Sequence, residues 1–351
     1  MRHSRITTII MVVVGLVLLM GLKTYYDAGE FKHIESSCDC ECTEISGIPG
    51  PEDIDIDYQS GIAYISSDDR ASALKGNALP GAIYSYDLKK FRMRKLTSNL
   101  HFDFHPHGIE LYKKDDGRQL LFVVNHRRQG HYIEIFEVKK KKLLHRESIR
   151  DEQMLTAPND ISVVNERMFY VTNDHGYTSK FGKALEEYLQ IGVSYVLFFD
   201  GKKFRKVAEK LKYANGIKMN KNGSLVYVAA PVAKLIRVFS RDSETNNLTF
   251  AQDIHINSGV DNIHLDPEGK LWAACHPKLL TFVRHSKDPS ILSPSQVIVI
   301  SFRGVEDYSL YEVFTDTGEL LSGSTIAVPY DNMFLVGSVF DDHLLRCEKL
   351  K

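Results

Sequence analysis

The chain has 351 residues, of which 43% are hydrophobic and 10% aromatic, so it can bury the core of a large domain. Lysine and arginine number 44 against 45 aspartate and glutamate residues, which gives a formal net charge of −1. This balance excludes the basic surface that nucleic-acid binding requires, and the short basic run Lys139–Lys142 lies where we expect a hairpin turn.

The N-terminal residues 1–24 carry a membrane-targeting pattern. Arg2 and Arg5 precede the uncharged apolar stretch Ile6–Leu22, whose 17 residues are at the lower limit for a helix that spans a bilayer. Lys23 and two tyrosines follow, as is typical of a membrane–water interface. We predict an uncleaved signal-anchor that contacts the membrane, with the rest of the chain periplasmic, secretory or on the cell surface. A cleaved signal peptide, and hence a secreted protein, is the alternative.

The cysteines favour an oxidising compartment. Cys38, Cys40 and Cys42 lie before the first repeat described below, and Cys347 lies after the last one. One disulfide between these ends would close a loop of about 300 residues, for which the chain-entropy model predicts about 5 kcal/mol of stabilisation. Any of the three could pair with Cys347, and Cys42 is the favoured partner. Cys275 lies inside an expected strand and is expected to be a buried free thiol.

A short motif recurs six times along the chain: a polar turn, an isoleucine and then an apolar strand. The segments read PEDIDI, PHGIEL, PNDISV, ANGIKM, VDNIHL and GSTIAV, and successive isoleucines are 46 to 63 residues apart. This period is typical of propeller blades rather than of solenoid repeats. The six isoleucines are Ile54, Ile109, Ile161, Ile217, Ile263 and Ile326.

Further strands complete each repeat. A second apolar run rich in aromatic and β-branched residues follows each motif, as in GIAYISS, RMFYVTNDH and GKLWAACHP. More strands are expected between the motifs, at Ala82–Leu88, His131–Glu137, Ser194–Asp200, Ile236–Ser240 and Gln296–Phe302. Four strands in each of six units predict an all-β fold, a six-bladed β-propeller spanning residues 46–351, with residues 25–45 as a cysteine-containing linker.

One helix is expected after the third repeat. In Lys183–Gln190 the apolar residues Leu185, Tyr188 and Leu189 fall on one face at helical spacing. Such a helix could form part of the wall of a substrate pocket, or it could simply cover an exposed strand edge.

The motif turns carry a set of oxygen ligands. If the inner strands of a propeller start at a common channel, their first side chains converge there. Two carboxylates and three amides with no thiolate or imidazole suit Ca²⁺ better than Zn²⁺ or Cu²⁺. Asp53 and Asp160, with a backbone carbonyl of the second repeat, could hold a second calcium deeper in the channel. The first set comprises Glu52, Asn159, Asn215, Asp261 and Asn262.

Histidines supply a candidate base. His107 occupies the position that Glu52 occupies in its own repeat, and His126 ends the next strand of the same blade. A near-neutral imidazole can activate a water, while a bound Ca²⁺ polarises a carbonyl, which together describe an ester or lactone hydrolase. His105 competes with His107 because both lie in one HPH turn. Two other histidines that end expected inner strands could line the pocket, His175 and His276.

The motifs GPEDIDI, HPHGI, VVNH, PNDI, TNDHGY, ANGI, VDNI and CHP together resemble those of the paraoxonase/arylesterase family. The resemblance covers nearly the whole chain after about residue 40. It implies a calcium-dependent carboxylic-ester hydrolase that acts on lactones and aryl esters, related to the gluconolactonase and strictosidine-synthase-like propellers.

The resemblance also implies residue roles. It implies a catalytic Ca²⁺ bound by the five oxygen ligands above, a structural Ca²⁺ bound by Asp53, Asp160 and the main-chain oxygen of Ile109, and a His107/His126 pair as base and partner. It further implies a retained N-terminal hydrophobic segment and a disulfide to Cys347. The family usually has one cysteine before the first blade whereas this chain has three, so the partner of Cys347 is left open.

Two other functions compete with the lactone and aryl-ester hydrolase. A sugar lactonase of the gluconolactonase type would share the metal face without needing the histidine pair. A non-catalytic calcium-binding propeller would need neither histidine. A condensing enzyme of the strictosidine-synthase type is disfavoured, because the metal ligands are intact.

Overall fold

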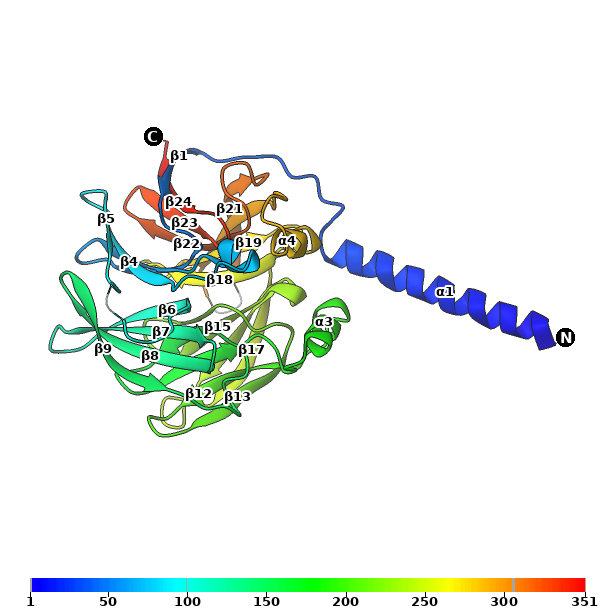
Figure 1. Cartoon of the computed structure of the whole chain (residues 1–351), viewed down its shortest axis with the longest axis horizontal. Helices are drawn as coiled ribbons and strands as arrows, with labels where there is room; N and C mark the ends of the chain where they lie inside the picture. The colour runs from blue at the N-terminus through cyan, green and yellow to red at the C-terminus, as the bar shows by residue number, and fades with distance from the viewer. Residues whose placement is uncertain (1, 99, 305–306, 351) are drawn as a thin grey trace.

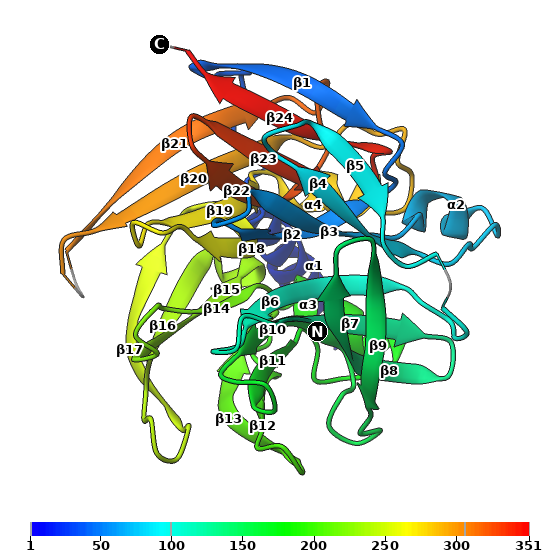
Figure 2. The ribbon, with the colours of Figure 1, turned by 90° about the vertical axis from the view of Figure 1, so that its left-hand side faces the viewer.

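The protein is described by a computed structural model that covers residues 2–98, 100–304 and 307–350. Beyond the N-terminal helix, these residues form six four-stranded antiparallel sheets arranged as blades around a ring (Figure 1; Figure 2). The predicted all-β six-bladed propeller is therefore confirmed.

Five blades each use four consecutive strands. Blades 1 and 2 are β2 (Pro51–Asp57), β3 (Ile62–Ser67), β4 (Ala82–Asp87), β5 (Arg92–Lys95), then β6 (Pro106–Lys113), β7 (Gln119–Arg127), β8 (Gly130–Lys139) and β9 (Lys142–Ile149). Blades 3 and 4 are β10 (Pro158–Val163), β11 (Phe169–Asn173), β12 (Ser194–Phe199), β13 (Phe204–Leu211), then β14 (Ile217–Met219), β15 (Leu225–Ala230), β16 (Leu235–Arg241) and β17 (Leu248–His255). Blade 5 is β18 (Gly259–Leu265), β19 (Leu271–His276), β20 (Ser295–Phe302) and β21 (Tyr308–Asp316).

Blade 6 is closed by the N-terminal part of the chain. It consists of β22 (Ser324–Tyr330), β23 (Met333–Ser338) and β24 (His343–Lys349), with β1 (Cys40–Ser46) paired antiparallel to β24. The expected linker over residues 25–45 therefore contains most of a propeller strand. This strand was not predicted because its sequence, CECTEIS, contains no apolar run. The pairing of β1 covers an edge of β24 that would otherwise be exposed.

Four α-helices and one 3₁₀ turn are present in the described part of the chain. They are α1 (Arg2–Asp27), α2 (Arg70–Leu74), α3 (Lys180–Tyr188), α4 (Leu279–His285) and η1 (Pro231–Ala233). The expected helix Lys183–Gln190 corresponds to α3, which begins earlier because the Ser179 side chain caps it by accepting a hydrogen bond from the Gly182 N–H. The helices α2 and α4 have no counterpart among the expected elements, because they are only one to two turns long.

The short helices lie on one face of the ring. α2, α3 and α4 each follow the second strand of a blade, and the end of that strand lies beside the start of the antiparallel inner strand. All three helices therefore cover the face at which the inner strands begin, and Figure 1 shows α1 leaving from the same side. The end of α1 docks there: Leu279 N donates to Ala28 O (2.9 Å), and Thr281 Oγ1 donates to Glu30 Oε2 (2.7 Å).

The stretch Ile6–Asp27 of α1 is long and apolar enough to cross a membrane. Its mean hydropathy is 2.4, and none of its apolar window is buried against the rest of the described chain. This agrees with a signal-anchor or a signal sequence by length and composition.

The recurring motif marks a bulge at the start of the inner strands. In β2, β6, β10, β18 and β22 the pairing register shifts just before the motif isoleucine, and β14 begins at its isoleucine. A bulge re-aims the neighbouring side chains, so the polar residues turn away from the sheet while the isoleucine stays in it. Each motif isoleucine is almost fully buried in one of the apolar clusters of the propeller.

Glycine in two of the motifs allows the inner strands to approach closely. A Cβ atom at Gly108 would lie 2.5 Å from Asp160 Cα, and one at Gly216 would lie 2.7 Å from Asn262 Cα. Any side chain at either position would push neighbouring inner strands apart. The two glycines therefore set the spacing of the residues described next.

Candidate metal centre and catalytic residues

The five predicted oxygen ligands lie at the starts of four inner strands and are all buried. Asn262 of blade 5 donates from Nδ2 to Glu52 Oε1 of blade 1 over 2.8 Å. These blades are not neighbours in the ring, so the bond links turns across the channel. Gly216 N donates to Asp261 O (3.2 Å), which places Asn215 beside the same group. The set, with exposed fractions of 1% to 7%, is Glu52, Asn159, Asn215, Asp261 and Asn262.

Four of these five side chains present a buried oxygen without a hydrogen-bond donor. Buried polar atoms are nearly always paired, so four unpaired acceptors in one cluster are unusual. Oxygen acceptors without donors are what a hard cation requires, and the set has two carboxylates and three amides. The unpaired atoms are Glu52 Oε2, Asn159 Oδ1, Asn215 Oδ1 and Asn262 Oδ1.

The carboxylates of this group are only partly compensated by the neighbouring residues that the structure describes. Burial is the main cause that raises the pKa of Glu52 to about 8; the charge of Arg70 opposes it, and the negative charges of Asp261 and Asp160 add to the rise. A positive ion among these oxygens would remove the repulsion. The geometry and the electrostatics therefore both fit a divalent cation at this place.

Asp53 and Asp160 form a second acidic pair. Burial, followed by the charge of a neighbouring carboxylate, raises the pKa of each well above its usual range. Their oxygens already accept backbone hydrogen bonds, with Ile109 N donating to Asp53 Oδ2 (2.6 Å) and Ile217 N donating to Asp160 Oδ2 (2.8 Å). A cation here would bind carboxylate oxygens that already accept hydrogen bonds from neighbouring inner strands. This second set therefore has fewer unpaired oxygens than the first.

A largely buried lysine that was not predicted from the sequence lies further along the inner strands. Lys218 Nζ is 3.0 Å from Glu110 Oε1 and 3.5 Å from Asp55 Oδ2. Its positive charge lowers the pKa of both Asp53 and Asp160, in opposition to burial. The available signal was the shared register, because Lys218, Asp55 and Glu110 each directly follow the motif isoleucine of their repeat.

His107 lies beside Glu52, one of the five predicted oxygen ligands. Its Nε2 lies 3.5 Å from Glu52 Oε1, and Arg70 Nη2 lies 2.8 Å from its Nδ1. Since a guanidinium has only donors, Nδ1 must accept this hydrogen bond, and the neutral ring then carries its proton on Nε2. Burial, and next the charge of Arg70, hold the pKa of His107 well below its usual range.

Arg70 is a site residue that the sequence analysis did not identify. It is the first residue of α2, and Asp69 caps that helix by accepting from Ser72 N. Its Nη1 atom is buried without a hydrogen-bond partner. Nothing in the sequence SSDDRAS indicated that this arginine reaches the HPH turn, because the contact depends on the position of α2 over blade 2.

The structure brings His126 next to His107. The two rings meet edge to face with centroids 5.0 Å apart, and His126 Nδ1 lies 2.8 Å from Nδ1 of His131. Burial, followed by the charges of His131 and Arg70, holds the pKa of His126 well below its usual range. His131 extends the predicted pair to three neutral rings.

His105, the competitor, is engaged elsewhere. Its Nδ1 lies 2.9 Å from Asp68 Oδ1 and its Nε2 3.2 Å from Asp103 Oδ1. The hydrogen bond with Asp68 raises the pKa of His105 against the opposing effect of burial, and Asp103 contributes in the same direction as Asp68. His107 is therefore the histidine of the HPH turn that faces the oxygen group.

The two remaining predicted histidines support residues of the site. His276 Nε2 donates to Asp261 Oδ2 over 2.8 Å, and the ring stacks on Phe282 of α4. His175 lies between Asp174 and Glu187 of α3, and Asp174 accepts a hydrogen bond from Asn159 Nδ2 (3.3 Å). α3 and α4 thus support two of the predicted ligands, Asn159 and Asp261, through histidine contacts, so the predicted helix does more than cover a strand edge.

Comparison with known proteins identifies the family. The family model described as Arylesterase matches residues 33–349. The chain belongs to the arylesterase family. It is therefore a carboxylic-ester hydrolase of the arylesterase and lactonase class, and the reading as a non-enzymatic propeller is not supported.

Several members of this family resemble the chain over most of their length. Serum paraoxonase/arylesterase 2 of Rattus norvegicus is 34% identical, over 98% of this chain and 99% of that protein. Serum paraoxonase/arylesterase 1 of Homo sapiens is 35% identical over 88% of each chain. Serum paraoxonase/lactonase 3 of Oryctolagus cuniculus is 34% identical over 85% of this chain and 86% of that protein.

Solved structures with low sequence identity share the fold. A luciferin-regenerating enzyme superposes with a TM-score of 0.58 at 12% identity and covers 89% of this chain and 96% of its own. Regucalcin of Agrobacterium tumefaciens, described as a calcium-binding protein, has a TM-score of 0.52 at 15% identity, over 91% of this chain and 96% of its own.

Proposed function

We propose that this arylesterase-family protein is a calcium-dependent hydrolase of lactones and aryl esters. The observation that carries the proposal is the group of four buried oxygen atoms without donors beside His107. The names of the relatives, arylesterase and lactonase, support the substrate classes, and the calcium-binding description of regucalcin supports the choice of ion.

The five oxygen residues would hold the catalytic ion. When bound, Ca²⁺ would supply a Lewis acid that polarises the substrate carbonyl and stabilises the oxyanion. The chain orients two of these ligands itself, because His276 fixes Asp261 and Asp174 fixes the amide of Asn159. Such hydrogen bonds would hold the ligand side chains in place while the ion binds and dissociates.

We assign the proton transfers to His107, with His126 as its partner. Burial keeps the His107 ring neutral, so it can accept the proton of an attacking water, and it can return that proton to the leaving alkoxide or phenoxide. The acceptor atom is Nδ1, because Nε2 carries the ring proton. Arg70 must therefore release Nδ1 before the proton is transferred. His126 packs against the ring and holds its plane.

We assign a second, structural Ca²⁺ to Asp53, Asp160 and the main-chain oxygen of Ile109. The raised pKa values of both carboxylates support this assignment, because two buried carboxyl groups repel each other unless they are protonated or bound to a cation. The second ion would join inner strands of blades 1, 2 and 3.

We also propose that the propeller lies outside the cytoplasm, anchored by α1 or secreted after its removal. The apolar helix and two disulfide bonds support an oxidising compartment. On this proposal residues 1–24 are a targeting segment, and the small-molecule substrate enters the face on which α1 docks.

Calcium removal tests the proposal. Hydrolysis of phenyl acetate and of a medium-chain δ-lactone should be lost after dialysis against a chelator and should return with Ca²⁺. Asn215→Ala and Asp261→Ala should weaken calcium binding measured by calorimetry, whereas Asn222→Ala, in an exposed turn, should not. Activity that persists without calcium would refute the metal mechanism. Activity confined to sugar lactones would identify a gluconolactonase-type enzyme instead.

A further inference from the structure

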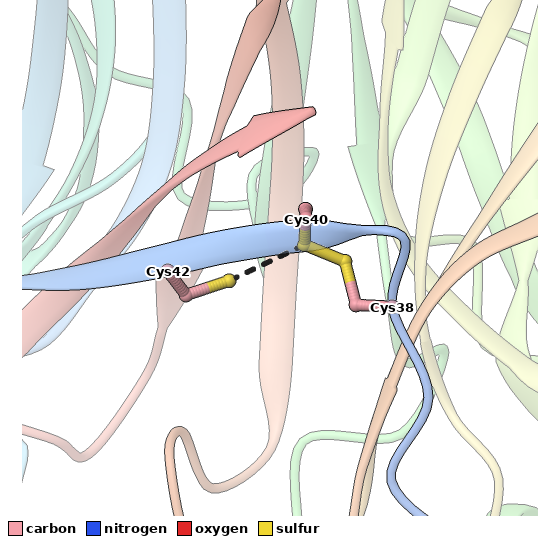
Figure 3. A group of neighbouring side chains, drawn as sticks. All are labelled: Cys38, Cys40 and Cys42. Atoms are coloured by element: carbon pink, nitrogen blue, oxygen red, sulfur yellow. Dashed lines mark hydrogen bonds between the residues drawn. A yellow bond between two sulfur atoms is a disulfide. The ribbon is translucent and has the colours of Figure 1, made fainter. Parts of the chain in front are cut away.

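Four cysteine sulfurs lie together where the ring closes. Cys42 on β1 stands opposite Cys347 on β24, and the two form a disulfide across the strands. Cys38 and Cys40 form a second disulfide just before and at the start of β1. Figure 3 shows the sulfur of Cys40 facing that of Cys42, and the two atoms are 3.5 Å apart. One disulfide therefore lies within reach of the other.

The contact is set by the fold. Residues two apart on a strand point to the same side, so Cys40 and Cys42 both pack against the apolar cluster shared by blades 5 and 6. The preceding residues are held as well: Ser37 and Thr315 exchange two backbone hydrogen bonds of 2.8 Å, and Cys38 Sγ lies 3.4 Å from Val313 O. The Cys38–Cys40 pair is thus docked on the outer strand of blade 5.

The two disulfides differ in access to solvent. Cys38 and Cys40 are half-buried and lie among the exposed residues Asp39 and Glu41, whereas Cys347 is completely buried. A thiolate from solvent can reach the Cys38–Cys40 bond more readily than Cys347, and exposed disulfides are the ones that exchange. The fourth sulfur, Cys42, is half-buried and adjacent to Cys40.

We propose that Cys38 and Cys40 form a thiol–disulfide exchange site, with a small thiol of the glutathione class as co-substrate, that opens and re-forms the Cys42–Cys347 bond. The hydrolase reaction does not use this site. The separation of 3.5 Å between Cys40 and Cys42 is at the distance at which reacting atoms attack without a backbone rearrangement.

The exchange is balanced with two thiols. The first thiolate attacks Cys38, forms a mixed disulfide and releases Cys40 as a thiolate. Cys40 then attacks Cys42, so that a Cys40–Cys42 bond forms while the Cys42–Cys347 bond breaks, and Cys347 leaves with the electron pair and takes a proton from water. A second thiolate removes the mixed disulfide from Cys38. Two thiols are oxidised to one disulfide, and Cys38 and Cys347 end as thiols.

A second sequence of exchanges, which uses no small thiol, closes the ring during oxidative folding. With Cys38–Cys40 oxidised and the other two reduced, the Cys42 thiolate attacks Cys40 and Cys38 leaves. Cys347 then attacks Cys42 and releases Cys40. The closing bond is formed and the Cys38–Cys40 bond is consumed, so the pair acts as an internal oxidant for the closing bond.

The test is the rate at which Cys347 becomes reactive. Oxidised full-length protein is incubated with reduced glutathione, quenched with a maleimide and cleaved after glutamate, which separates Cys40 from Cys42 at Glu41. Wild type should yield a Cys40–Cys42 disulfide peptide and labelled Cys347. The double variant Cys38→Ser/Cys40→Ser, which keeps the closing bond, should label Cys347 at least tenfold more slowly. Equal rates, or no Cys40–Cys42 peptide in wild type, would overturn the proposal.

Two single variants complete the experiment. Cys38→Ser leaves Cys40 as a thiol beside the closing bond, so Cys347 should become labelled without any added thiol. If Cys347 stays unreactive in that variant, the proposal fails. Cys275→Ser removes the buried free thiol far from the cluster and should label Cys347 at the wild-type rate. A slower rate there would also contradict the assignment, because Cys275 would then take part.

Discussion

Arg70 donates a hydrogen bond from Nη2 to Nδ1 of His107 over 2.8 Å. The guanidinium is always charged and has only donors, so it fixes the ring proton on Nε2, on the side of Glu52. Its charge also contributes, after burial, to the low pKa of His107. Arg70 thus keeps the proposed base neutral but occupies the atom that must accept the proton.

Replacement of Arg70 by glutamine should move the acid limb of the pH profile. Without the guanidinium the pKa of His107 rises, so the ring stays protonated up to a higher pH and the acid limb of kcat/KM shifts upward. The measurement is kcat/KM for phenyl acetate against pH in saturating calcium. Arg92→Gln, in an exposed position of β5, is the matched control. A limb that stays in place or moves to lower pH contradicts the role of Arg70.

Replacement of His107 by glutamine should separate catalysis from metal binding. Loss of a general base lowers kcat by roughly 10²- to 10⁴-fold, while the calcium isotherm should stay unchanged because no oxygen ligand is lost. His105→Gln is the control on the same turn, since that ring is held by Asp68 and Asp103, and its kcat should stay near the wild-type value. A variant of His107 that loses calcium would show that the residue is structural.

The sequence predicted the oxygen group because the motif repeats. Six turns in one register imply one axis, and the bulges before the isoleucines put the polar residues there. The same register predicted His107, because this residue occupies in the second repeat the position that Glu52 occupies in the first. Repetition is therefore what makes residues such as Glu52 and Asp261, far apart in the chain, predictable as neighbours.

Arg70 could not be found in this way, because it reaches His107 from the helix α2, which lies outside the repeated motif. Lys218 does hold a recurring position, directly after a motif isoleucine, and its partners Asp55 and Glu110 hold the same position in their own repeats. The strand β1 was missed because alternating cysteines and acids do not form an apolar run. Contacts made by unique elements depend on the assembled fold, which a periodic pattern does not encode.

Removal of an oxygen that has no hydrogen-bond donor should hardly lower the stability of the calcium-free protein. Asn215 Oδ1 has no donor, so Asn215→Ala should leave the apo melting temperature nearly unchanged. Wild type at a calcium concentration 100 times Kd should gain about 2.7 kcal/mol, or about 5 °C in Tm, and the variant should lose most of this gain at the same concentration. Differential scanning calorimetry with and without calcium measures both effects. An apo protein strongly destabilised by the change would show that Asn215 has a structural partner instead.

The protein should lose stability at alkaline pH because His175 loses its proton there. Burial alone would lower its pKa, but the hydrogen bonds to Asp174 and Glu187 outweigh burial and raise it from 6.5 to about 9. A raised pKa means that the folded state holds the proton more tightly. The stabilisation is therefore complete below pH 6.5 and is lost as the pH rises through about 9, and it amounts to no more than about 3 kcal/mol.

Urea unfolding of wild type and His175→Gln at a series of pH values checks this effect. The variant should be less stable than wild type at acidic pH and should approach it at alkaline pH. A constant difference across this range would show that the ring contributes through packing, for example against Tyr213, rather than through its charge.

Lys218 should stabilise the fold only while its partners Asp55 and Glu110 are charged. Burial lowers its pKa, but Asp55 and Glu110 outweigh burial and raise it, so the ammonium is charged in the folded state. Lys218→Met leaves two largely buried carboxylates without their cation and should cost about 3–5 kcal/mol in the free energy of unfolding. Glu110→Gln in the same chain should restore part of that loss, since it removes one of the two uncompensated charges. A double-mutant cycle in urea, with calcium held saturating, measures the coupling, and strictly additive losses would show that the ammonium and Glu110 do not interact.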